Sequence, residues 1–202
     1  MARRRWLVIG GGSSQFVTKR GQIARETPMK PLAEHMAFYA AYHRDRRNQL
    51  THFVGVPAIA FSILIPMAWA HAGPVSLALL FLLGTLVWYW RLDRTLAITL
   101  AIVFLPAWAI AEWIARMPLL AGLSVFLLFF VGGWIVQLIG HVFEGRTPAL
   151  VDNFLQVLVA PLFLAAEVYF ALGLKQELKA EVERLVPRHL PAAALARAQP
   201  QT

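Results

Sequence analysis

The sequence contains no cysteine and few charged residues. Only 15% of its 202 residues are Asp, Glu, Lys or Arg, whereas an average soluble domain has about 25%. The absence of thiols excludes disulfides, thiolate metal sites, iron–sulfur clusters and cysteine nucleophiles. The low charge together with 58% hydrophobic residues excludes intrinsic disorder of the whole chain. Any metal site must therefore be built from histidine and carboxylate side chains.

The few charges are concentrated at the two ends of the chain. Residues 1–52 hold ten Lys/Arg and three acids, residues 175–202 hold five and three, and the 122 residues between them hold nine charges in all. This distribution is typical of an integral membrane protein with basic ends. Because the basic residues flank apolar segments instead of forming a stripe on a folded domain, we expect membrane lipids as partners and no nucleic acid.

The ends and the middle of the chain differ in character. Residues 1–28 combine a basic cluster with a Gly-rich run, which indicates a disordered leader without an assigned function. Residues 29–174 form the predicted membrane-embedded domain. Its first helix is predicted over residues 30–43 because Pro31 stands near the start and no breaker follows. Residues 175–202 are expected to be a cytoplasmic tail with a short amphipathic helix over 177–188.

The middle of the chain is dominated by five long apolar segments. At about 20 residues each they are long enough to cross a bilayer as helices, and they lack the alternation of strands. Five crossings would place the basic tail outside, against the positive-inside rule, and the last segment carries Asp152, Asn153, Gln156 and Glu167. We therefore predict an all-α bundle with four spans, a re-entrant or packed fifth helix, and cytoplasmic termini. The segments are 53–72, 74–90, 95–115, 117–140 and 150–174.

This topology predicts that three histidines meet at one membrane interface. His43 and His52 precede the first span, and His141 ends the fourth span on the same side. In one continuous helix His43 and His52 would point in opposite directions, so we expect a turn at residues 44–48, with Asn48 as the N-cap of the next helix. The other histidines are His71 at the opposite face, His189 in the tail, and His35 as a weaker fourth candidate.

A second polar pattern surrounds His141. Gln137, His141 and Glu144 stand at i, i+4 and i+7, so they share one helix face among apolar residues. Polar side chains at this depth are costly unless they are paired or bind something. The pattern fits a metal or catalytic site, and it also fits an interhelical hydrogen-bond network with Asp152 or Gln156.

Three neutral imidazoles with a carboxylate and no thiol suit iron(II) or zinc. A non-heme iron oxygenase leaves positions open for substrate and dioxygen, whereas a hydrolytic zinc site leaves one open for water. The spacing of the residues does not distinguish the two metals. A site at the membrane interface does indicate an amphiphilic substrate, with its polar head at the metal and its chain in the bilayer.

Two groups of residues in this sequence resemble the motifs of the 2-hydroxy fatty acid dioxygenase family, which consists of small multi-pass membrane proteins. The resemblance covers residues 29–174 and leaves residues 1–28 outside. The first group is Tyr42-His43-Arg44, Asn48, His52, Gly55 and Pro57; the second is Gln137, Gly140-His141, Glu144, Pro148-Ala149-Leu150 and Asp152-Asn153.

The resemblance implies an Fe(2+)-dependent dioxygenase that uses dioxygen to shorten 2-hydroxy fatty acids by one carbon, with release of carbon dioxide. Carried over position by position, His43, His52 and His141 become the expected iron ligands. Glu144 becomes either a fourth ligand or, as we favour, the acceptor that orients an imidazole. Asn48 is expected to fix the turn that brings His43 and His52 together.

Two further functions remain open from the sequence. A zinc-dependent membrane amidase or lipase would also place histidines near the interface. A non-enzymatic membrane scaffold would use the polar residues only to pack helices. The expected location is an integral membrane one in each case: the inner membrane if the protein is bacterial, or the endoplasmic reticulum membrane if it is eukaryotic.

Overall fold

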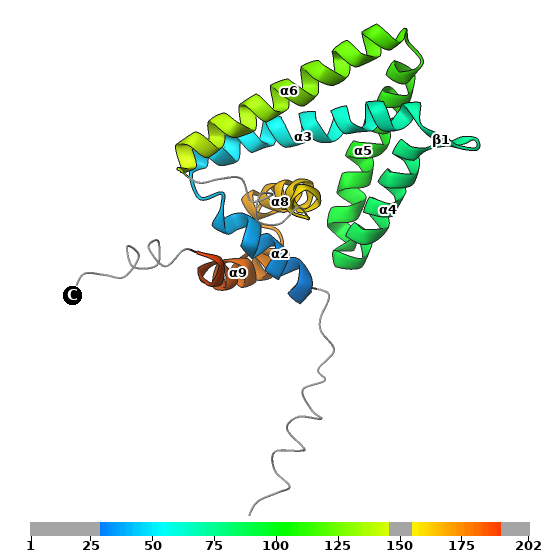
Figure 1. Cartoon of the computed structure of the whole chain (residues 1–202). Coiled ribbons are helices and arrows are strands. Elements are labelled where there is room, and N and C mark those ends of the chain that lie inside the picture. The colour runs from blue at the N-terminus through cyan, green and yellow to red at the C-terminus, as the bar shows by residue number, and fades with distance from the viewer. Residues whose placement is uncertain (1–28, 146–154, 191–202) are drawn as a thin grey trace, which may run out of the picture.

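The computed structural model describes residues 29–145 and 155–190, and these fold almost entirely into helices (Figure 1). The predicted leader at 1–28, the end of the tail at 191–202, and Asp152 and Asn153 lie outside the described residues. A two-residue antiparallel pair, β1 (His71–Ala72) with β2 (Val75–Ser76), joins α3 to α4. The helices are α2 (Met29–Ala41), α3 (Arg46–Trp69), α4 (Leu77–Leu92), α5 (Arg94–Ala115), α6 (Leu119–Glu144), α8 (Gln156–Ala171) and α9 (Gln176–Leu185), followed by the 3-10 turn η1 (Val186–His189).

Three helices, α3, α5 and α6, are long and apolar enough to cross a membrane. Their outer faces carry large exposed apolar side chains, such as Ile102 and Leu128, which suits contact with lipid. Helices α4 and α8 are apolar but have only 16 residues each. The all-helical prediction is confirmed, and three of the four predicted spans have the expected length.

Helices α3 and α6 form a close antiparallel pair (Figure 1). At their crossing, a Cβ added to Gly55 would lie 2.5 Å from Cγ of Gln137 and 2.9 Å from the carbonyl oxygen of Gly133. Only glycine fits there, and small residues of this kind let two helix backbones approach within a membrane. The pairing brings the first turns of α3 beside the last turns of α6.

Helices α4 and α5 run beside each other and leave the α3–α6 pair at a wide angle (Figure 1). Helix α8 packs against α2, α3 and α5, and nine of its 16 residues are buried. Tyr89 of α4 donates a hydrogen bond to the carbonyl of Leu158 (2.6 Å). Lys175, after α8, forms a 2.6 Å ion pair with Asp93 between α4 and α5. The described part of the fifth apolar segment is thus a helix packed among the others.

The predicted amphipathic helix of the tail forms over Gln176–Leu185, and η1 continues it. Its apolar side chains Leu178, Val182 and Leu185 stand at i, i+4 and i+7 and are buried. They belong to the same core as α2, which α9 contacts. The tail helix therefore docks on the protein itself and is not only a surface helix.

Candidate metal centre

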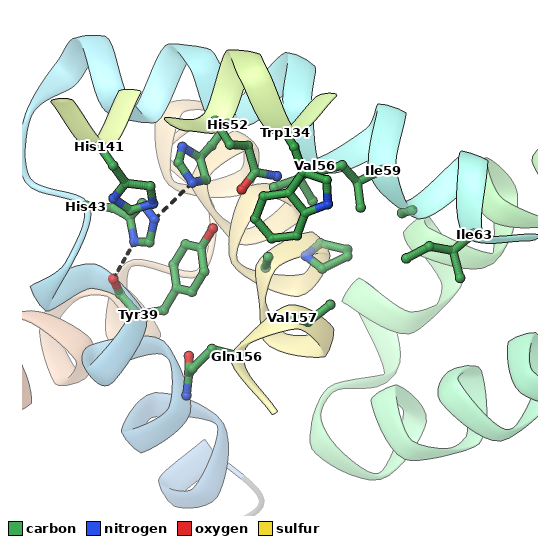
Figure 2. A pocket seen from close by; sticks show the side chains of 14 residues that line it. Tyr39, His43, His52, Val56, Ile59, Ile63, Trp134, His141, Gln156 and Val157 are labelled. Atoms are coloured by element: carbon green, nitrogen blue, oxygen red, sulfur yellow. Dashed lines mark hydrogen bonds between the residues drawn. The ribbon is translucent and has the colours of Figure 1, made fainter. Parts of the chain in front are cut away.

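Three separate elements bring His43, His52 and His141 together (Figure 2). His43 follows α2, His52 lies in the second turn of α3, and His141 lies in the last turn of α6. Their exposed fractions are 3%, 2% and 6%. One ring nitrogen from each lies within 4.8 Å of the others, and no second cluster of three potential metal ligands occurs in residues 29–145 and 155–190. The predicted convergence of these histidines is therefore confirmed.

The hydrogen bonds of two imidazoles define which nitrogen faces the centre. Nδ1 of His43 lies 2.7 Å from the carbonyl oxygen of Tyr39, and Nδ1 of His52 lies 2.8 Å from that of Asn48. Because a carbonyl oxygen only accepts, both Nδ1 atoms must carry the proton. In the neutral rings each Nε2 atom then carries a lone pair and no proton, yet the two Nε2 atoms lie only 3.1 Å apart.

Two lone pairs at this distance repel each other unless a cation lies between or beside them. A shared proton or a metal ion meets this need, and a third imidazole, His141, lies 5.0 to 5.1 Å away from the other two, centroid to centroid. Neutral imidazoles oriented by backbone carbonyls are a usual donor set for a protein-bound transition metal. The residues present therefore fit a metal ion.

The turn between α2 and α3 differs from the prediction in one respect. Helix α3 begins at Arg46, and its N-cap is Asp45, whose carboxylate accepts from the backbone N–H of Arg47 (2.8 Å). The prediction of Asn48 as N-cap is wrong, because the charged connector is short and Asp45 is itself a good capping residue. Asn48 instead lies buried in the first turn, and its Nδ2 donates to the carbonyl of Tyr42 (3.4 Å).

Glu144, the last residue of α6, bonds the turn between α2 and α3. Its carboxylate accepts from the backbone N–H groups of Arg44 (3.0 Å) and Asp45 (2.8 Å) and from Nδ2 of Asn48 (3.1 Å). These donors lie at the N-terminus of α3, where the helix dipole favours a negative charge. The orienting acceptors for His43 and His52 are backbone carbonyls, so the contacts of Glu144 fix the turn and only indirectly the rings.

Helices α3 and α6 approach each other closely beside the three histidines. A Cβ on Gly140 would collide with Oγ1 of Thr51 and lie 2.5 Å from Oδ1 of Asn48. Gly145 ends α6 with a left-handed backbone, φ 68°, which favours glycine. The last turn of α6, with His141 and Glu144, is thereby pressed against the first turn of α3.

A cavity of about 60 Å³ opens beside the three histidines. Tyr39 lines it and stacks on the ring of His43, with centroids 3.9 Å apart and an interplanar angle of 10°. Figure 2 shows the Tyr39 hydroxyl directed toward the side of the cavity where His52 lies. Burial raises the pKa of Tyr39, so the phenol keeps its proton and can donate a hydrogen bond. Its position four residues before His43 was the available signal in the sequence, but the motifs gave it no role.

The other predicted polar residues divide between two places. Gln137 and Gln156 line the cavity with His141, as the shared face of Gln137 and His141 predicts. Glu167 does not share this cavity; it lines a separate, more polar pocket with Glu183. Trp134, which no sequence pattern marks as a site residue, lies in the wall of the cavity (Figure 2).

The remaining histidines lie away from the centre. His35 makes an edge contact with Trp88, with centroids 6.1 Å apart. His71 is exposed in the β1–β2 turn at the far end of α3. His189 lies 3.2 Å from Glu34. The weaker candidate His35 is therefore not part of the centre.

The fold and this site define a helical, membrane-type protein with a buried three-histidine centre. The family model of the 2-hydroxy-palmitic acid dioxygenase Mpo1-like proteins matches residues 29–172, so the chain belongs to this family. It is also similar to the 2-hydroxy-palmitic acid dioxygenase MPO1 of Saccharomyces cerevisiae, with 35% identity over 164 residues, covering 75% of this chain and 87% of the yeast protein. No solved structure matches the chain.

Proposed function

We propose that this protein is an iron(II)-dependent dioxygenase that shortens 2-hydroxy fatty acids by one carbon, with release of carbon dioxide, at the cytoplasmic face of a membrane. Family membership supports the reaction class. One observation supports a bound metal most directly. The Nε2 atoms of His43 and His52, each with a lone pair, lie 3.1 Å apart in a buried position beside His141.

In this proposal His43, His52 and His141 hold the iron through neutral imidazoles. Iron(II) held by these three nitrogens would leave positions for substrate and dioxygen and would mediate the transfer of electrons from the 2-hydroxy acid to dioxygen. The carbonyls of Tyr39 and Asn48 keep the Nδ1 protons in place, which fixes both ring orientations. Asn48 and Glu144 are assigned as positioning residues, because their contacts hold the turn that carries His43.

Tyr39 can donate a hydrogen bond to the substrate. Its phenol is buried and protonated, and its ring is fixed by stacking on His43. Apolar side chains, including Val56 and Ile59, line the cavity around it. In such an environment a hydrogen bond to a carboxylate is stronger than in water.

The shape of the interior supports a long-chain substrate. Four residues, Ala60, Ile63, Val157 and Pro161, line both the histidine cavity and a second cavity between α3, α4, α5 and α8. The walls of the second cavity are almost entirely apolar. The cavity that would hold a polar head at the histidines therefore lies directly beside an apolar space that suits an acyl chain.

The finer topology is also a proposal: α3, α4, α5 and α6 cross the membrane, α8 packs among them, and both termini are cytoplasmic. The ion pair of Lys175 with Asp93 supports it, because it joins the α4–α5 turn to the start of the tail. The contact of α9 with α2 links that tail to the basic N-terminal part. Reporter fusions after Lys175 should report a cytoplasmic location and fusions at Gly73 the opposite side; a tail on the same side as Gly73 would contradict the proposal.

The function can be tested on full-length protein purified in mild detergent and loaded anaerobically with iron(II). With 2-hydroxypalmitic acid and oxygen, we expect a fatty acid one carbon shorter, carbon dioxide, and matching oxygen consumption. Protein loaded with zinc should be inactive. Release of fatty acid from an amide or ester lipid without oxygen consumption would instead indicate the zinc hydrolase, and neither activity in metal-loaded protein would favour a scaffold.

A further inference from the structure

Gln156 is a buried residue of the cavity whose function the metal centre does not explain. It is the first residue of α8 and is 2% exposed. Both polar atoms of its side chain, Oε1 and Nε2, are buried without a hydrogen-bond partner among the residues that the structure describes. It lines the same cavity as the three histidines (Figure 2).

An amide in this state is costly to the folded protein. A buried donor or acceptor without a partner costs about 1 to 3 kcal/mol, and Gln156 contributes one group of each kind. A leucine or methionine would fill a similar volume at that position without this cost. The amide is therefore explained best by a ligand that satisfies it.

The chemistry of the cavity indicates what that ligand group is. Among the described residues that line the cavity there is no lysine or arginine, so this described lining offers a substrate carboxylate neutral donors. A side-chain amide has an N–H donor and a carbonyl acceptor side by side. A 2-hydroxy acid presents the complement, a carboxylate acceptor and a hydroxyl donor on adjacent carbons.

We propose that the Gln156 side-chain amide binds the polar head of the substrate and recognises its 2-hydroxyl group through a hydrogen bond. Nε2–H donates to the carboxylate, and Oε1 accepts from the 2-hydroxyl. This proposal rests on the proposed function and assigns one determinant of its substrate specificity. A fatty acid without the hydroxyl leaves Oε1 buried and unpaired, and a site of this kind discriminates strongly against such an analogue.

The test compares Gln156→Leu with a matched glutamine outside the cavity. Gln176 is likewise the first residue of its helix, but its Nε2 donates to the carbonyls of Phe170 (3.1 Å) and Leu174 (3.2 Å). Binding of 2-hydroxypalmitic and palmitic acid is measured by equilibrium dialysis with iron-loaded, full-length protein under anaerobic conditions, where no turnover occurs. Iron content and thermal stability without ligand are measured on the same samples.

For Gln156→Leu we expect wild-type iron content, equal or higher thermal stability, and binding of 2-hydroxypalmitic acid weakened at least about tenfold, the effect of one lost hydrogen bond. Its preference for the 2-hydroxy acid over palmitic acid should shrink accordingly. Gln156→Glu should weaken the binding of both acids, because it places a second carboxylate beside the first. Gln176→Leu should lower the stability and leave the preference unchanged.

Two results would overturn the role of Gln156 while leaving the proposed function intact. One is an unchanged preference in iron-loaded Gln156→Leu protein. The other is a loss of stability like that of Gln176→Leu, which would show that the amide is paired within the fold. Absence of iron from the wild-type protein would overturn the proposed function and, with it, the substrate assigned to Gln156.

Discussion

Replacing Glu144 with alanine separates the residues that hold the turn from those that hold the metal. The carboxylate of Glu144 accepts from the backbone N–H groups of Arg44 and Asp45 and from Nδ2 of Asn48. Without this carboxylate the three donors must hydrogen-bond to water instead, and the turn that carries His43 is no longer bonded to α6. We therefore expect a less stable protein with a weaker metal centre that still contains all three histidines.

The size of the effect follows from these contacts. A hydrogen bond of this kind contributes about 1 kcal/mol net, and the bonds from Asp45 and Asn48 are partly buried, whereas those from Arg44 are exposed. Counting only the partly buried bonds, which both end at Oε2, Glu144→Ala should cost about 2 kcal/mol of unfolding free energy. Glu144→Gln should cost less, because its amide oxygen can take the position of Oε2. Loss of a group that bonds a metal ligand directly lowers metal affinity about 10- to 100-fold, and Glu144 acts one step further out, so we expect a decrease of at most about tenfold.

The assay is thermal unfolding in detergent together with competition for iron(II) by a chelator of known affinity. The matched control is Glu112→Ala, because Glu112 is also paired, with Ser76 and with Nε1 of Trp108 (2.9 Å), away from the histidines. The control should lose stability and keep its iron affinity. Complete loss of iron binding in Glu144→Ala would refute the reasoning and make Glu144 a direct ligand, and unchanged stability would refute the role of its contacts with the turn.

Three further changes test other parts of the account. Gly140→Ala forces a Cβ against Thr51 and should lower both stability, by about 1 to 3 kcal/mol, and iron affinity; unchanged thermal unfolding would contradict the close helix approach. Tyr39→Phe should keep iron and stacking but lower kcat/KM about tenfold in a turnover assay, so full activity would exclude the phenol as donor. Ala60→Phe should narrow the junction of the two cavities and shift the preferred chain length downward, and unchanged kcat/KM across a chain-length series would contradict the acyl path.

Much of the helical fold was predictable because apolar length and turn residues are local properties of the sequence. The five apolar segments correspond to α3, α4, α5, α6 and α8, with ends shifted by up to seven residues. The wide angle between the α3–α6 and α4–α5 pairs was not predictable, because it depends on how side chains interlock. The docking of α9 on α2 was missed for a related reason: an amphipathic helix looks the same in sequence whether its apolar face meets lipid or protein.

The site was predictable to the level of its three histidines and of the face that Gln137 shares with His141. Membrane sidedness and the expected turn were enough to bring His43, His52 and His141 together. The capping residue was misassigned because Asp45 and Asn48 are both good N-caps, and only the backbone decides between them. That Gln156 has no hydrogen-bond partner among the described residues could not be predicted, since this depends on what surrounds the side chain and not on its spacing from the histidines.

The central claim, that His43, His52 and His141 form an iron centre, is tested most directly by elemental analysis of protein purified without chelators. The account predicts close to one iron per wild-type chain, a metal content near zero in each of the three His→Ala variants, and wild-type content in His71→Ala and His189→Ala. Equal metal loss from all five variants, or wild-type iron in His141→Ala, would contradict it.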